Sequence, residues 1–299
     1  MTRLSPNAQG ILYMVAAMFM FSSMDMLAKL LSERYEVLQV VWARYAGQMA
    51  VVLIVLAPRL RALIQTKHLG LQLLRSALLF SATFCFFTSL SYMNIASATA
   101  VMNVHPMLLT LGAALILKES LGPRRIFGII AALIGALIII RPGADVFTLA
   151  SLLPLAAGFF YASYALATRF LGRDEDILTS FIYTALIGTI VASSLVPTVW
   201  TLPDMGDTGL FLLLGAIAAL GQLALIKSLT VAEAGAVAPF GYCGVVFATF
   251  YGVIAFGELP DAYGLLGALV IIGAGLYVWH RETQAKAAPQ ASASAAHRD

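Results

Sequence analysis

Long stretches of apolar residues follow one another along this chain, separated by short segments that carry charge, proline or glycine. A helix needs roughly 20 such residues to cross a bilayer. Inside hydrocarbon, every backbone polar group must be satisfied within the spanning structure, which favours helices. Hydrophobic residues make up 61% of the 299-residue chain and charged residues only 11%, whereas soluble domains have roughly 45–50% and 25%. The sequence therefore predicts an all-α integral membrane protein with about ten transmembrane helices.

We place the predicted helices where apolar runs end at charge, proline or glycine. The expected spans are 10–31, 38–57, 73–92, 97–117, 126–140, 149–170, 179–199, 209–229, 235–256 and 263–280. No small-residue cleavage site typical of a signal peptide follows the first span, so we expect it to remain as a helix. The remainder, 281–299, is rich in alanine, serine and glutamine and predicts a disordered tail.

The distribution of basic residues predicts the orientation. Only four of the 18 Lys and Arg residues, namely Lys29, Arg34, Arg44 and Arg141, fall on one side of the predicted topology. The others fall on the side that also holds both termini. Because cytoplasmic loops carry an excess of Lys and Arg, we expect a multi-pass protein of a bacterial inner membrane with both termini in the cytoplasm.

The second half of the chain repeats the first. When the sequence is shifted by 139 residues, Ser89 falls on Ser228 and Glu119 falls on Glu258. Each copy holds five predicted helices, and because five is odd the second copy enters the membrane from the opposite side. This pattern predicts two inverted five-helix repeats, an architecture of secondary transporters with a site at the repeat interface. The predicted parts are a first repeat over 1–145, a second over 146–280 and a cytoplasmic tail over 281–299.

Two matching stretches carry a family resemblance. They are Ser89-Leu-Ser-Tyr-Met with Leu-Lys-Glu119-Ser, and Lys227-Ser-Leu with Phe-Gly-Glu258-Leu. With the duplication, they make the chain resemble EamA-type transporters of the drug/metabolite transporter superfamily over about residues 10–279. The resemblance implies a secondary transporter of amino acids, vitamins, nucleotide-like cofactors or sugars, working inward or outward. It specifies the fold better than the solute.

Charged residues inside the first two spans are the first candidate site. Asp25 on the first span and Arg44 on the second share a predicted depth, several residues inside the hydrocarbon. A charge at such a depth is costly unless it is paired or hydrated. We expect the two to pair, either as a substrate contact and gate or as a structural ion pair. Lys29 and Trp42 fit interfacial anchors better.

Polar residues near the middle of the fourth span are the second candidate. Asn103 and His105 precede Pro106, which we expect to kink the helix. Pro239 predicts a similar break in the ninth span, where Tyr242 occupies the position equivalent to Asn103. His105 is either a substrate or proton-relay residue or a packed, hydrogen-bonded histidine.

Further polar side chains occur in apolar spans. Tyrosine hydroxyls and glutamine amides need partners in hydrocarbon, so such residues are expected to face an interior cavity. They are Gln48, Tyr161, Tyr164, Gln222 and Tyr242. Such a cavity suits a solute with a planar or aromatic ring, such as a vitamin, a nucleoside-like cofactor or an amino acid. Each tyrosine taken alone could equally fill the core or the lipid interface.

Small residues predict packing faces. Gly128, Ala132 and Gly135 recur at helical spacing in the fifth span, and Gly264 and Gly267 begin a similar series in the tenth. Small residues allow helices to approach closely. We expect contacts within the chain, with a dimer interface as the weaker alternative, and therefore a monomer or a weak homodimer.

Signatures of other protein classes are missing. The sequence contains no H-E-x-x-H, Walker A or G-x-S-x-G motif, no catalytic constellation, and no histidine cluster for a metal. The net charge of +3 does not favour nucleic acid. We predict a cofactor-free, alternating-access transporter of a small organic metabolite, and the sequence leaves open whether it works by proton coupling, by exchange for a counter-substrate or by facilitated diffusion. An exporter of amino acids or toxic metabolites is the alternative, and an intramembrane enzyme or a channel is less favoured.

Overall fold

The computed structural model describes residues 5–118, 122–144, 147–171 and 175–295, and this part of the chain is helical with no strands. Its elements are α1 (Pro6–Ser32), α2 (Val37–Leu56), η1 (Ala57–Arg59), α3 (Leu60–Leu63), α4 (Leu69–Leu90), α5 (Ile95–Met102), α6 (His105–Leu117), α7 (Pro123–Ile140), η2 (Leu149–Leu152), α8 (Leu153–Leu171), α9 (Ile177–Leu195), η3 (Val196–Thr198), α10 (Met205–Val231), α11 (Ala234–Val237), η4 (Ala238–Tyr242), α12 (Cys243–Phe256) and α13 (Ala262–Ala295).

These elements form ten spans that are long and apolar enough to cross a membrane. Several spans join consecutive elements: 37–63 combines α2, η1 and α3, and 95–116 combines α5 with most of α6. The predicted all-α membrane fold of ten helices is confirmed. The structural spans overlap all ten predicted ones, and most of them begin a few residues earlier.

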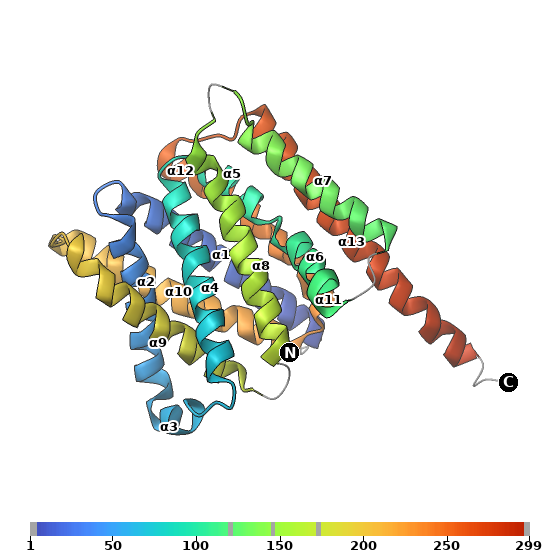
Figure 1. Cartoon of the computed structure of the whole chain (residues 1–299), viewed down its shortest axis with the longest axis horizontal. Coiled ribbons are helices and arrows are strands. Elements are labelled where there is room, and N and C mark those ends of the chain that lie inside the picture. Colours follow the sequence, from blue (N-terminus) through green and yellow to red (C-terminus); the bar gives the residue numbers. More distant parts are fainter. Residues whose placement is uncertain (1–4, 119–121, 145–146, 172–174, 296–299) are drawn as a thin grey trace.

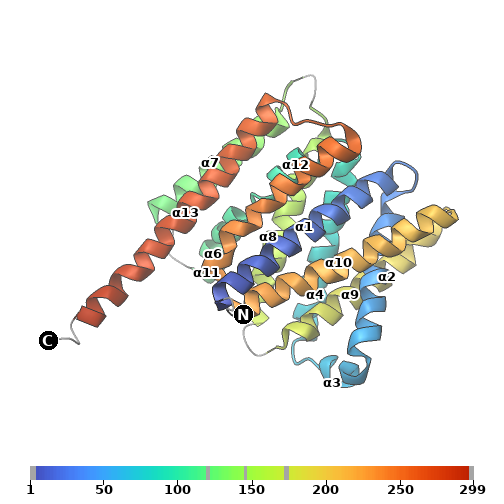
Figure 2. The same ribbon diagram turned by 180° about the vertical axis from the view of Figure 1, so that it is seen from behind.

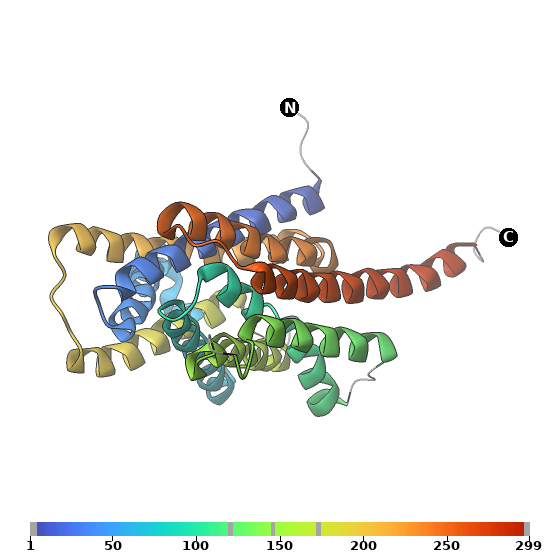
Figure 3. The same ribbon diagram turned by 90° about the horizontal axis from the view of Figure 1, so that it is seen from above.

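The helices lie in two layers, seen from above in Figure 3. One layer contains α12, α1 and α10, and the other contains α6, α8 and α4, with neighbours in each layer packed side by side. Two further pairs join the layers. α2 packs against α9 at one edge, and α7 packs against α13 at the other, as Figure 1 shows.

The two repeats exchange their first helices. α1 packs against α10 and α12 of the second repeat, and α8 packs against α4 and α6 of the first. Buried hydroxyls support the exchange: the Ser228 Oγ donates to the Gly10 carbonyl at 2.7 Å, and the Ser22 Oγ donates to the Gly244 carbonyl at 3.1 Å. The interior of the bundle is therefore bounded by both repeats on each side.

The fourth and ninth spans are broken, as their prolines predict. Asn103 and Val104 separate α5 from α6, and Pro106 stands in the first turn of α6. Pro106 has no N–H to donate to the Met102 carbonyl four residues earlier. The Nδ1 of His105 lies 3.1 Å from that carbonyl oxygen and can donate to it in place of the missing N–H. In the ninth span, Pro239 falls within η4, between α11 and α12.

Glycines set the contact between α7 and α13. A Cβ added to Gly267 would lie 2.5 Å from the Gly135 carbonyl oxygen, and one added to Gly135 would lie 2.9 Å from the Gly267 carbonyl oxygen. Only glycine allows two helix backbones to approach so closely. Ala132, one turn before Gly135 on α7, is fully buried. These small-residue faces therefore pack within the chain.

α1 begins, and α13 ends, on the same side of the molecule, as Figures 1 and 2 show. We call this side the termini end and the opposite side, where α1 finishes, the Lys29 end. α13 continues as a helix to Ala295, where the sequence predicts a disordered tail. The many alanines in this segment have high helix propensity, which explains the difference. Residues 296–299 and Glu119 lie outside the described residues.

Candidate transport cavity

A cavity of about 650 Å³ lies between the two layers. Its volume is within the range of about 300–1,000 Å³ typical of small-ligand sites. Toward the Lys29 end it is lined by buried residues such as Asp25, Arg44 and Phe87. Toward the termini end its lining includes exposed residues, among them Leu229 and Ala238. The cavity therefore reaches the surface at the termini end.

Most of the residues predicted from the sequence meet on the wall of this cavity. They are Asp25, Arg44, Asn103, His105, Tyr161, Tyr164, Gln222 and Tyr242. Gln48 is the exception. It is buried on α2, one turn beyond Arg44, but it does not line the cavity. The wall also includes residues of α4 and α13, such as Thr83 and Trp279, which the sequence did not indicate.

Three aromatic rings form a continuous face of the wall, which we call the aromatic wall. The rings of His105 and Tyr161 meet edge to face with centroids 4.7 Å apart, and those of Tyr161 and Tyr164 lie 5.6 Å apart. Tyr161 and Tyr164 are three residues apart on α8 and so share one helix face. His105 joins them because the break before α6 directs its Nδ1 to the Met102 carbonyl. The wall can accommodate a flat ring by stacking or edge contacts.

Arg75 supports the aromatic wall from behind. Its Nη2 donates to the Tyr164 hydroxyl at 2.8 Å, its Nε donates to the Thr168 Oγ1 at 2.6 Å, and its Nη1 donates to the Ser180 carbonyl at 3.1 Å. The guanidinium also lies 4.7 Å from the centre of the Tyr164 ring. In the sequence, Arg75 is only one of the basic residues on the side that holds both termini. The sequence feature that could have indicated its role is its position one turn after Gln72, at the start of an apolar run.

The predicted ion pair between Asp25 and Arg44 is not formed. Among the described residues, no basic nitrogen lies within 4.0 Å of the Asp25 carboxylate. The Arg44 Nη1 instead donates to the Thr83 Oγ1 at 2.9 Å, and the guanidinium stacks on the ring of Tyr45 at 4.7 Å. Shared depth was predicted correctly, since both side chains line the closed end. It did not predict the direction of the Arg44 side chain.

Lys29 forms the ion pair that closes this end. Its Nζ donates to both carboxylate oxygens of Glu258 at 2.6 Å and to the Met93 carbonyl at 3.3 Å. Lys29 is buried and also lies 4.9 Å from the centre of the Phe256 ring. The prediction of an interfacial anchor was therefore wrong for Lys29, because α12 places an acid beside it. Trp42 donates to the Ser193 Oγ at 3.0 Å, and its anchoring role stays a prediction.

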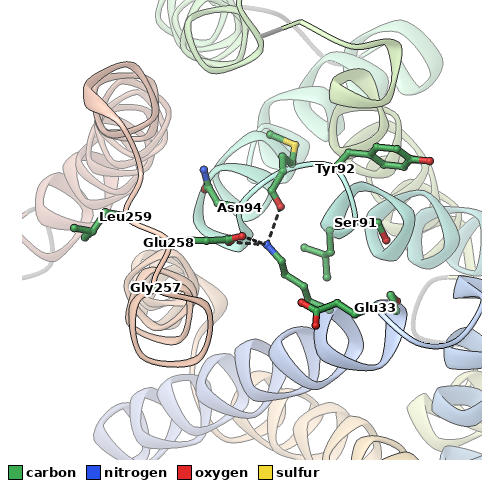
Figure 4. A pocket seen from close by; sticks show the side chains of 11 residues that line it. Glu33, Ser91, Tyr92, Asn94, Gly257, Glu258 and Leu259 are labelled. Atoms are coloured by element: carbon green, nitrogen blue, oxygen red, sulfur yellow. Dashed lines mark hydrogen bonds and ion pairs between the residues drawn. The ribbon is translucent and has the colours of Figure 1, made fainter.

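The Lys29–Glu258 pair stands in a second hollow at the surface of the Lys29 end. This vestibule has a volume of about 680 Å³. Figure 4 shows Glu258 and Asn94 close together on one side of the vestibule, with Glu33 on the other side. Asp25 lies one helical turn from Lys29 toward the cavity. The ion pair therefore lies between the vestibule and the closed end of the cavity.

Two more ion pairs lie at the Lys29 end. The Arg34 Nη1 contacts the Asp207 carboxylate at 2.7 Å, and the Arg141 Nη2 contacts the Asp261 carboxylate at 2.6 Å. Arg34 and Arg141 belong to the first repeat, and both acids belong to the second, as in the Lys29–Glu258 pair. Within the described part of the chain, opposite charges thus join the repeats at this end.

The broken spans are also packed more tightly at the Lys29 end than at the termini end. α5 reaches the Lys29 end and packs against both α12 and α13. The equivalent elements at the termini end are α6 and the α11–η4 segment. Within the described ranges they make no comparably extensive contact.

The sequence profile of the EamA-like transporter family matches the chain twice, over residues 8–141 and 148–279. The chain belongs to the EamA-like transporter family. The two matches cover one repeat each, and together they span nearly all of the helical bundle described above. Membership in this family makes the chain a multi-pass membrane transporter of a small solute.

Individual members of the family support this assignment. The chain is 32% identical to a riboflavin transporter of Vibrio cholerae over 284 residues, covering 92% of this chain and 94% of the relative. It is 27% identical to a pseudopaline exporter of Pseudomonas aeruginosa over 268 residues, covering 88% and 93%. A crystal structure with 18% sequence identity superposes with a TM-score of 0.61, covering 90% of this chain and 96% of the other, which supports the fold.

Proposed function

We propose that this transporter carries a metabolite with a planar ring, of the flavin class, by alternating access through the cavity between its two layers. The aromatic wall of His105, Tyr161 and Tyr164 is the observation that supports this best. Flat aromatic ligands gain from edge and offset contacts with such rings. Riboflavin, the solute in the name of the Vibrio cholerae relative, is a molecule of this kind.

The repeat architecture supports the alternating-access part of the proposal. The cavity is closed at the Lys29 end and open at the termini end. In an inverted repeat, the packing at one end has a structural counterpart at the other. Closing α6 against the α11–η4 segment, while α5 separates from α12, would expose the same cavity to the other side. From the basic-residue distribution, we place the open end in the cytoplasm.

The test is counterflow of labelled riboflavin in proteoliposomes. Liposomes that contain the purified protein and an excess of unlabelled riboflavin should accumulate labelled riboflavin transiently, while empty liposomes should not. A carrier shows this stimulation by solute on the opposite side. Counterflow of ring-free amino acids without any counterflow of riboflavin, nucleosides or aromatic amino acids would contradict the planar-ring assignment.

A matched pair of variants assigns the activity to the wall. Tyr161→Leu removes a ring from the aromatic wall and should reduce riboflavin counterflow by about tenfold, the equivalent of about 1.4 kcal/mol of lost interaction. Tyr13→Leu makes the same change at an exposed position of α1 outside the cavity, and it should leave counterflow unchanged. Equal activity in the two variants would show that the wall does not contact the solute.

A further inference from the structure

Asp25 and Arg44 face the closed end of the cavity from different helices, Asp25 from α1 and Arg44 from α2. Their relative exposures are only 7% and 8%. The surrounding lining at this depth, which includes Met24 and Phe86, is apolar and buried. Two charged groups are therefore held in a region that excludes most water.

Both groups have unused hydrogen-bonding capacity. Within the described residues, the buried Nε of Arg44 has no hydrogen-bond partner, and the Asp25 carboxylate accepts no hydrogen bond and contacts no basic nitrogen. The Oγ1 of Thr99, which lines the same cavity, is also buried without a partner. A buried polar group without a partner is costly.

Other buried charged side chains in the described part of the chain have partners. Lys29 contacts Glu258, Asp207 contacts Arg34, and Arg75 donates to several oxygens. Asp25 and the Nε of Arg44 face the cavity without a partner, whereas Arg141, whose buried Nε is also unpartnered, is held by its ion pair with Asp261. A partner that enters the cavity can satisfy them, because buried charges are otherwise paired or hydrogen-bonded.

We propose that Asp25 and Arg44 form a polar clamp that recognises the imide edge of a heterocyclic ring, and this inference rests on the proposed transport of ring-bearing metabolites. A carboxylate only accepts hydrogen bonds, and a guanidinium only donates them. A ligand that satisfies both must present an N–H to Asp25 and a neighbouring carbonyl to Arg44. An imide edge carries these groups side by side in the plane of the ring. The isoalloxazine ring of riboflavin and the uracil ring both have one.

The clamp and the aromatic wall then contact different parts of one ligand. Asp25 and Arg44 hold the polar edge of the ring at the closed end, while Tyr161 and His105 contact its face or outer edge. The remaining substituents point toward the open end, where Gln222 is a further polar residue of the lining. A ligand carboxylate is disfavoured at the clamp because Asp25 repels it.

Binding of matched ligands to the purified protein in detergent tests the clamp. In 3-methylriboflavin a methyl group replaces the imide N–H, so Asp25 loses its donor while the ring and the carbonyls remain. The wild-type protein should bind riboflavin about tenfold to hundredfold more tightly than 3-methylriboflavin, the range expected for a hydrogen bond to a charged group. Uridine and 3-methyluridine form a second pair with the same difference.

Variants separate the two members of the clamp. Asp25→Ala should reduce the ratio of the two binding constants, riboflavin over 3-methylriboflavin, to about one, mainly by weakening the binding of riboflavin. Arg44→Gln should weaken the binding of both ligands by a similar factor and leave the ratio of their binding constants unchanged, because both ligands retain the carbonyl. Glu33→Ala removes a carboxylate at the exposed end of α1, and it should change neither constant. Asp25→Asn, which preserves the shape of the side chain, should also reduce the preference and replaces Asp25→Ala if that variant does not fold.

The outcomes distinguish the clamp from the proposed function. Equal binding of riboflavin and 3-methylriboflavin by the wild-type protein overturns the clamp and leaves flavin transport standing. A preference that persists in folded Asp25→Ala and Asp25→Asn also overturns it. If riboflavin does not bind but the protein prefers uridine over 3-methyluridine through Asp25, the clamp stands and the flavin assignment fails. Failure of all four ligands to bind overturns both.

Discussion

The two ends of the cavity are built from equivalent helices of an inverted repeat, yet only one of them is closed. At the Lys29 end, α5 packs against α12, and ion pairs join the two repeats. At the termini end, the described residues of α6 and the α11–η4 segment are not packed in this way, and Leu229 and Ala238 of the cavity lining are exposed. The family fold supplies the symmetry, and ion pairs accompany closure at the Lys29 end.

The ion pairs of the Lys29 end can be compared with the equivalent positions of the other half. In each ion pair at the Lys29 end, the base comes from the first repeat and the acid from the second. The 139-residue shift places His280 at the position equivalent to Arg141, and Gly122 at the position equivalent to Asp261. The Arg141–Asp261 pair therefore has no equivalent pair of opposite charges in the other half. The Lys29–Glu258 pair differs in this respect, because its positions carry the same charges in the other half of the sequence, as Arg169 and Glu119.

Among these predictions, removing the Glu258 side chain should have the largest effect on the stability of the closed Lys29 end. Glu258→Ala leaves Lys29 buried without its acid partner, and loss of one member of a buried pair costs about 3–5 kcal/mol. Because the Glu258 side chain is 34% exposed, we expect a smaller loss of about 2–3 kcal/mol in the free energy of unfolding. The midpoint of thermal unfolding in detergent should fall, and riboflavin counterflow should fall with it.

Two further variants control this prediction. Exchange of the charges, Lys29→Glu with Glu258→Lys, should recover much of the lost thermal stability. Glu33→Ala removes a carboxylate from the same vestibule but breaks no ion pair, and its unfolding midpoint should match that of the wild type. An unchanged midpoint in Glu258→Ala would show that the pair does not stabilise the closed end.

Substitutions at the contact between α7 and α13 should lower the stability nearly as much. This contact runs along both ends of the bundle, so it tests stability that does not depend on the ion pairs. Gly267→Val places a side chain 2.5 Å from the Gly135 carbonyl oxygen, and overpacking of this kind typically costs about 1–3 kcal/mol. Gly273→Val on the same helix has open space around its Cβ, so its unfolding midpoint should stay near that of the wild type. Equal midpoints in the two variants would contradict a tight contact between α7 and α13.

Cross-linking should detect a change in which end is closed. Leu109→Cys on α6 and Ala238→Cys on η4 place thiols on the cavity lining toward the termini end, after the native Cys85 and Cys243 are replaced by alanine. Adding Glu258→Ala should increase cross-linking by a bifunctional thiol reagent about fivefold, the effect of a population shift of about 1 kcal/mol. Adding Glu33→Ala instead should give no increase. Less cross-linking with Glu258→Ala would mean that the two ends do not alternate.

The Arg141–Asp261 pair should contribute least. Its side chains are 29% and 48% exposed, and exposed ion pairs contribute about 0–1 kcal/mol. Arg141→Gln should therefore lower the unfolding midpoint only slightly, and high salt should remove the difference from the wild type by screening the pair. A decrease as large as that of Glu258→Ala would show that closure depends on the whole charged surface and not on the buried pair.

Much of this fold could be read from local features of the sequence. Apolar length predicts the ten spans, because a bilayer sets the number of residues that a helix needs. Pro106 and Pro239 predict the broken spans, because proline removes a backbone donor. Polar residues within apolar spans, such as Asp25 and Tyr161, predict a shared interior cavity, because hydrocarbon penalises them elsewhere.

The partners of these residues depended on the tertiary structure. Lys29 looked like an interfacial anchor until α12 brought Glu258 beside it, and Arg75 looked like a loop charge until α8 brought Tyr164 beside it. Arg44 shares its depth with Asp25 but points to Thr83. Sequence fixes how deep a side chain lies along its own helix. The direction it faces and its partner depend on how the helices pack, and for Lys29 and Arg75 on the exchange of first helices between the repeats, which no local pattern encodes.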